Sequence, residues 1–203
     1  MINNFRKTMP IKKIETAQVK RQAGFTLVDI LVGLGMASIL MVAIVSLFTT
    51  LGRSYTIQNV AAGVQHVTRA GIDEMVMNIR MAGLNPLNIA DVGIKDDYSN
   101  TRIRFTADID ASGVIGDFDD EDIAYLFEEN KLKRQVGGGN RIELVRNVSD
   151  FSLSYLTEDN NVAADASEIR TVLISMTVTE PAGRGGSISR TYSTRVRCRN
   201  LGL

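Results

Sequence analysis

Hydrophobic residues are concentrated in one uninterrupted run near the amino terminus. No charged residue occurs between Asp29 and Arg53. A helix of roughly 20 apolar residues is long enough to cross about 30 Å of hydrocarbon. We therefore predict that residues 25–52 form a membrane-spanning helix.

The apolar pattern continues beyond this run with a helical period. Hydrophobic side chains recur at steps of mostly three and four residues, which is typical of a helix that buries one face. The stripe consists of Ile57, Val60, Ala61, Val64, Val67, Ile72, Met75, Val76, Ile79 and Ala82. Gly83 and Pro86 follow as stop signals. We expect one helix over residues 25–82, with no proline inside it to cause a kink.

Beyond Pro86 the pattern becomes that of short strands separated by turns. The strand candidates are Thr101–Ala107, Ile123–Glu128, Lys131–Val136, Arg141–Asn147, Phe151–Thr157, Ile169–Thr179 and Ile188–Cys198. Glu129 and Asn130 are expected to close a tight hairpin. Successive strands with short connections predict an antiparallel sheet packed by one face on the helix stripe. The expected fold class is α+β, with residues 53–203 forming a globular head that includes the amphipathic half of the helix.

Charge is distributed unevenly along the chain. Residues 1–24 contain six basic side chains and one acidic side chain. Because basic residues are retained on the cytoplasmic side, the amino terminus is expected in the cytoplasm and the head outside it. The remainder has 17 basic and 22 acidic residues, a formal charge of −5. This balance does not favour bulk nucleic-acid binding.

The junction between the basic leader and the apolar run carries the most specific motif. It reads Lys20-Arg21-Gln22-Ala23-Gly24-Phe25-Thr26-Leu27-Val28-Asp29-Ile30-Leu31. This segment resembles the prepilin-type signal of type IV pilins and of type II secretion pseudopilins. The resemblance implies that a prepilin peptidase cuts between Gly24 and Phe25, removes residues 1–24 as a leader, and methylates the new amino terminus. The implied fold is pilin-like.

Asp29 stands at the fifth mature position, where the family usually has Glu. The resemblance implies an assembly role, in which this carboxylate pairs with the amino-terminal ammonium of a neighbouring subunit. A carboxylate in lipid is costly and normally has a partner. Asp is one methylene shorter than Glu, so a looser pairing is expected. The alternative is that Asp29 simply lies at the membrane interface.

Weaker similarity extends into the head. Three segments are similar to PilW-type minor pilins and the related J-type pseudopilins, namely Asn78–Pro86, Val145–Tyr155 and Arg195–Leu201. The resemblance implies a minor pilin with a structural role in assembly or priming, near the filament tip. Its implied partners are prepilin peptidase, other major and minor pilin subunits, the inner-membrane assembly platform, and membrane lipid before assembly. The implied location is the inner membrane, as a single-pass protein with a periplasmic head, and then the pilus or pseudopilus.

One acidic segment of the head has the spacing of an EF-hand-type calcium loop. Calcium prefers oxygen ligands, which such a loop supplies at positions one, three, five, seven and twelve, with glycine at six. The corresponding residues are Asp108, Asp110, Ser112, Val114 and Asp119, with Gly113 at the sixth position. No helix is expected before the loop, and seven acids crowd residues 108–122. A solvated acidic loop without calcium therefore stays open as the alternative.

Other candidate chemistry is weak. His66 and Cys198 are the single histidine and single cysteine, which excludes an internal disulfide and a Cys/His metal cluster. We find no nucleophile–base pair and no phosphate loop, so an enzyme is not expected. Two alternatives to a pilus subunit remain. One is a minor pseudopilin of a type II secretion system, and the other is a single-pass anchored binding domain that is never cleaved at Gly24.

Overall fold

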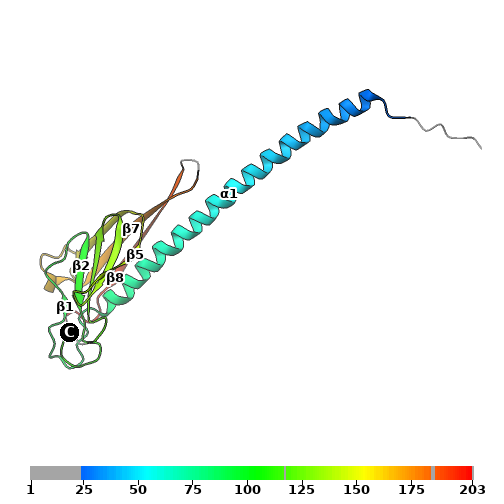
Figure 1. Cartoon of the computed structure of the whole chain (residues 1–203). Helices are drawn as coiled ribbons and strands as arrows, with labels where there is room; N and C mark the ends of the chain where they lie inside the picture. The colour runs from blue at the N-terminus through cyan, green and yellow to red at the C-terminus, as the bar shows by residue number, and fades with distance from the viewer. Residues whose placement is uncertain (1–23, 117, 184–185, 203) are drawn as a thin grey trace, which may run out of the picture. The chain divides into compact units, whose positions relative to one another are not determined.

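The computed structural model describes residues 24–116, 118–183 and 186–202. The expected leader, apart from Gly24, lies outside these residues. The chain divides into two compact units, Met1–Phe48 and Thr49–Leu203. Its elements are α1 (Leu27–Met81), β1 (Gly93–Ile94), β2 (Arg102–Thr106), β3 (Asp122–Glu128), β4 (Lys131–Val136), β5 (Arg141–Val145), β6 (Val148–Leu156), the 3-10 helix η1 (Ala166–Glu168), β7 (Thr171–Pro181) and β8 (Ser187–Arg197). This confirms the α+β fold class, a long amino-terminal helix followed by an antiparallel head (Figure 1).

In the first unit α1 is apolar on every side, and all of its described residues are exposed. Its large hydrophobic residues, from Leu27 to Phe48, are each about half exposed or more. This part of α1 is long and apolar enough to cross a membrane. A single such helix near the amino terminus is a candidate membrane span or signal anchor.

In the second unit α1 buries one face. The buried residues are Val64, Thr68, Gly71, Ile72, Met75 and Ile79. Most of these residues, namely Val64, Ile72, Met75 and Ile79, belong to the stripe predicted from the sequence, which is confirmed there. The stripe is wrong at Val67, which is 44% exposed. Thr68 is buried because its hydroxyl donates to the carbonyl of Val64 at 2.7 Å, which satisfies the polar group.

The helix ends as the sequence predicts. Gly83 has a φ of 82°, a left-handed conformation that glycine adopts without strain. Its N–H donates to the carbonyl of Thr106 at 3.0 Å. A Cβ at Gly83 would lie 2.4 Å from Leu201, so the tight exit also requires glycine.

The first sheet has five antiparallel strands in the order β1-β2-β3-β4-β5. The predicted tight hairpin between β3 and β4 is confirmed, because Glu128 pairs with Lys131 and both intervening residues have positive φ. Such a pair of φ values belongs to the turns whose twist matches that of the strands. The two-residue strand β1 and the helix η1 were not predicted.

The remaining strands form a separate sheet in the order β6-β7-β8. The sequence predicted one sheet, and this is where the expectation differs from the structure. Asn147, between β5 and β6, has a φ of 56° and turns the chain away from β5. Its carbonyl accepts a hydrogen bond from the Thr179 N–H at 2.9 Å, and β6 consequently pairs with β7.

One hydrophobic core joins α1 to both sheets. The rings of Phe127 on β3 and Phe151 on β6 lie 5.8 Å apart. The single hydroxyl proton of Tyr155 on β6 is shared between the carbonyl oxygens of Ser99 and Arg102, at 2.8 and 2.7 Å from the hydroxyl oxygen. The head is therefore one packed body in which the connection between β2 and β3 lies at the end where α1 stops (Figure 1).

Candidate functional site

The expected processing site lies just before α1. Gly24 and Phe25 are both exposed, Phe25 by 89%, and a Cβ at Gly24 would meet nothing within 4 Å. The peptide bond that joins them is therefore accessible in the described structure. A protease that recognises glycine followed by an apolar helix would meet no obstruction from the described part of the chain.

Asp29 is held by the start of α1. The Thr26 N–H donates to Asp29 Oδ2 at 3.0 Å, and the Asp29 N–H donates to Thr26 Oγ1 at 3.2 Å. This reciprocal pair is a capping box, which satisfies backbone donors that have no partner inside the helix. Asp29 thus stabilises the helix start within its own chain, whatever it does in an assembly. The sequence carries this signal as Thr-x-x-Asp before an apolar run, although the capping role of Asp29 was not predicted from it.

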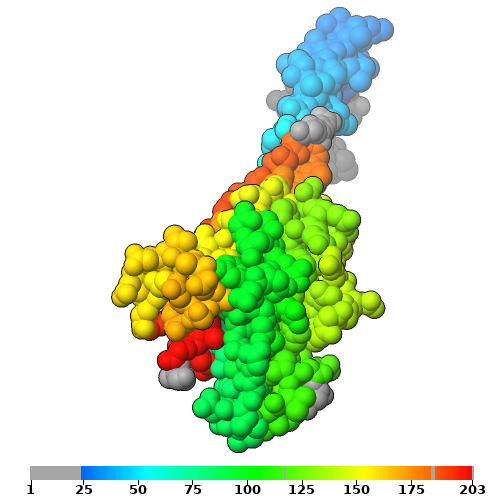
Figure 2. Space-filling model, turned by 90° about the vertical axis from the view of Figure 1, so that its left-hand side faces the viewer, coloured from blue at the N-terminus to red at the C-terminus, as the bar shows by residue number. Residues whose placement is uncertain are grey.

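Backbone hydrogen bonds hold the ends of the connection between β2 and β3 in place. The Ala107 N–H donates to the carbonyl of Glu121 at 2.9 Å, which draws the ends of the loop together. The Asp108 N–H donates to the carbonyl of Leu84 at 2.8 Å, which ties the loop to the exit of α1. In Figure 2 the green residues that follow α1 and those of this loop together form the lower end of the head.

Three carboxylates meet inside this loop. Asp108, Asp110 and Glu121 place carboxylate oxygens within 4.8 Å of one another. Asp108 and Glu121 are fully buried, and Asp110 is exposed. Of the acids expected as calcium ligands, the structure brings together Asp108 and Asp110. It places Glu121 beside them, whereas Asp119 is exposed and outside the cluster.

The loop backbone is folded around these carboxylates. Glu121 accepts hydrogen bonds from the N–H groups of Ile109 and Gly116, both at 3.0 Å. Asp108 Oδ2 accepts one from Gly113 at 3.1 Å, but the buried Oδ1 has no hydrogen-bond partner in the described structure. The three carboxylates are therefore held in place, and one buried oxygen of Asp108 has no hydrogen-bond partner among the described residues.

Asp110 is ionised at neutral pH. The backbone N–H of Ser112 donates to its carboxylate at 2.9 Å and lowers its pKa. Ser112 and Val114, the other expected ligands, instead bond to each other, because the Ser112 hydroxyl donates to the Val114 carbonyl at 3.2 Å. Gly113, the glycine at the sixth loop position, has a left-handed conformation with a φ of 79°, and a Cβ there would lie 2.3 Å from Ile89.

Two acids next to the cluster, Asp120 and Asp122, pair with arginines. Asp122 forms a bidentate pair with Arg104, with N–O distances of 2.9 and 2.7 Å. Asp120 pairs with Arg134. Within the described residues, none of the three clustered carboxylates forms an ion pair. The cluster therefore brings three carboxylates together without a basic partner among the described residues.

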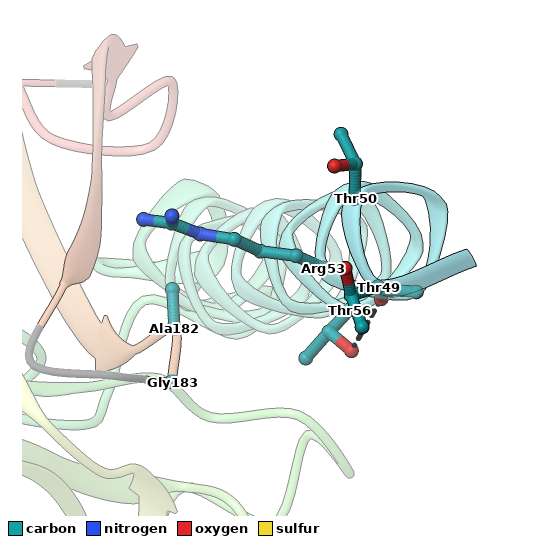
Figure 3. Close-up of a pocket in the computed structure, with 7 residues that line it drawn as sticks. Thr49, Thr50, Arg53, Thr56, Ala182 and Gly183 are labelled. Carbon is teal, nitrogen blue, oxygen red and sulfur yellow. Dashed lines mark hydrogen bonds between the residues drawn. The ribbon is translucent and has the colours of Figure 1, made fainter. Parts of the chain in front are cut away.

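A groove of about 430 Å³ lies between α1 and the turn after β7 (Figure 3). It is lined by Thr49, Thr50, Gly52, Arg53, Thr56, Ala182 and Gly183. Arg53 extends from the helix on the side of Ala182, and the Thr56 hydroxyl donates to the Gly52 carbonyl at 3.0 Å. None of these described lining residues is an acid, a histidine or a cysteine.

The single cysteine and the single histidine lie outside the carboxylate cluster. Cys198 is buried, and burial raises the pKa of its thiol to about 11, which leaves it protonated and unreactive at neutral pH. His66 is exposed on α1.

A scan of the chain against protein-family models finds no match, and a search of curated proteins also finds none.

Proposed function

We propose that the chain is a minor pilin subunit of a type IV pilus, with a structural role in filament assembly and priming near the tip. The observation that carries this proposal is the order of its parts. A Gly-Phe-Thr-Leu-Val-Asp motif starts a helix that is apolar on all sides and then becomes amphipathic as it enters a β head. An anchored head alone needs the apolar span but not the motif that precedes it.

The exposed first part of α1 supports an assembly role. Apolar surface of this extent is not stable in water and needs lipid or other helices around it. Lipid of the inner membrane covers it before assembly, and helices of neighbouring subunits cover it in a filament. The head then lies on the periplasmic side and afterwards on the filament surface.

Asp29 has two roles in this proposal. In the single chain it caps α1 through Thr26. In the filament its charge pairs with the ammonium of a neighbouring subunit, which makes assembly depend on a carboxylate and not only on a cap. The two roles are separable, because an asparagine side chain can still accept the Thr26 hydrogen bond but carries no charge.

The test is the amount of the chain in filaments sheared from cells that make it, measured by immunoblot for wild type, Asp29→Glu and Asp29→Asn. We expect wild-type chain in the filament fraction. We expect Asp29→Glu to be retained, because Glu keeps the charge and suits the capping box. We expect Asp29→Asn to fall at least about tenfold, since a missing charge pair in lipid is worth more than 1.4 kcal/mol. Equal membrane levels of the three proteins serve as the control.

The outcomes separate the candidate functions. Recovery of wild-type chain only in the filament of a secretion system would indicate a pseudopilin. Chain that stays in the membrane and never enters a filament would contradict the proposal and favour an anchored periplasmic binding domain. Wild-type levels of Asp29→Asn in filaments would show that Asp29 acts only as a cap.

A further inference from the structure

We propose that Asp108, Asp110 and Glu121 bind a calcium ion that fixes the connection between β2 and β3 to the end of α1. The site differs from the EF-hand spacing in its third acid. Glu121, two residues beyond the twelfth position of the loop, takes the place that the spacing gives to Asp119.

The unsatisfied oxygen of Asp108 is the first argument. Buried polar atoms in folded proteins nearly always have a partner, and a charged oxygen without one is especially costly. Asp108 is fully buried, its Oδ2 is occupied by Gly113, and its Oδ1 has no partner in the described structure. Its carboxylate is one of the three that place oxygens within 4.8 Å of one another. A bound cation supplies the missing partner.

Uncompensated charge is the second argument. Like charges held close together in a poorly hydrated site repel one another, and two of the three carboxylates are buried. Arginines neutralise Asp120 and Asp122 on either side of Glu121. The described structure gives the cluster itself no such partner, although the hydrogen bonds from Ile109, Gly113 and Gly116 hold it together.

The ligand chemistry selects calcium. Calcium takes six to eight oxygen ligands at about 2.3–2.6 Å, so two ligands on opposite sides of the ion lie about 5 Å apart. The carboxylate oxygens of the three residues lie within 4.8 Å of one another, which is close enough for one such ion to contact all three. Asp110 is exposed, which leaves room for water to complete the shell. Magnesium prefers to keep its waters in a strict octahedron, so this fixed loop should hold it more weakly.

The site stabilises one end of the head. The Asp108 N–H donates to the carbonyl of Leu84, which lies in the exit of α1. Glu121 immediately precedes β3. An ion held by both residues therefore links the helix exit to the first sheet. The role of the ion is structural, and its binding does not depend on whether the bond between Gly24 and Phe25 is cleaved.

The experiment uses the full-length protein in detergent micelles. After treatment with a chelator, its melting temperature is measured by circular dichroism in CaCl₂ and in MgCl₂ at equal ionic strength. An extracellular site of this kind binds with a Kd on the order of 10⁻⁴–10⁻³ M. At calcium about ten times above Kd we expect the melting temperature to rise by about 3–6 °C. Isothermal titration calorimetry should give one calcium per chain.

Two variants and a matched control locate the ion. Asp108→Asn and Glu121→Gln should each lose the calcium-dependent rise, and Asp119→Asn should keep it. The wild-type stoichiometry tests the proposal even if a variant does not fold. No calcium bound by wild type, an equal rise with magnesium, or loss of the rise in Asp119→Asn alone would each overturn the proposal.

Discussion

Among the buried side chains of the head, Tyr125 shows how burial controls a titration. It is fully buried, and its hydroxyl oxygen accepts a hydrogen bond from the Asn78 amide at 2.7 Å. Burial raises the pKa of Tyr125 to about 12, and it also raises the pKa of Tyr155. Both rings are neutral in the folded state at every physiological pH.

This shift predicts loss of stability at alkaline pH. Between pH 10 and 12 the unfolded chain loses the Tyr125 proton and the folded chain keeps it, so the free energy of unfolding falls as pH rises. The contribution of one such group reaches about 1.4 kcal/mol per pH unit. We expect urea midpoints at pH 8, 10 and 11 to fall less steeply in Tyr125→Phe than in wild type. Parallel curves for the two proteins would contradict this account.

The acidic loop shows how far single residues could be predicted. The spacing of Asp108 and Asp110, and the left-handed turn at Gly113, follow from a short local motif that the structure preserves. Glu121 could not be found in this way, because the spacing of positions one to twelve assumes a helix after the loop. Here a strand follows, and its start brings Glu121 back beside Asp108 through the Ala107 hydrogen bond.

At the scale of elements, periodicity predicted α1 and most strands because each buries one regular face. It did not predict the division into two sheets. The chain turns at Asn147, which has a positive φ, and the Asn147 carbonyl accepts a hydrogen bond from Thr179 on β7. Hydrophobic periodicity does not record such contacts between distant residues. It also missed Gly71, which is buried because α1 approaches β5 closely at that point.

Gly71 therefore predicts a measurable cost at the contact between α1 and the first sheet. A Cβ there would lie 2.4 Å from Val145 Cγ2, so Gly71→Ala should lower the free energy of unfolding by about 1–3 kcal/mol. Gly63, on the same helix, has nothing within 4 Å of an added Cβ. Gly63→Ala should instead stabilise by about 0.5–1 kcal/mol, because alanine favours the helix. Urea unfolding of both variants checks this prediction, and equal effects would show that the close approach is not rigid.

At the scale of the whole molecule, the two units differ in how much of their apolar surface is exposed to solvent. The head buries its own core around the second part of α1. The first unit exposes nearly all of its apolar side chains in the single chain. Apolar surface of this extent favours burial in lipid or against other helices, and this is the basis of the proposed assembly role.

The cleavage between Gly24 and Phe25 is the central claim of this account, and the intact mass of the protein tests it most directly. The chain is extracted from membranes of cells with and without a co-expressed prepilin peptidase. We predict a peptidase-dependent product that begins at methylated Phe25 and contains all residues to Leu203. A full-length mass in both cells, or a cut after residue 52, would contradict the account.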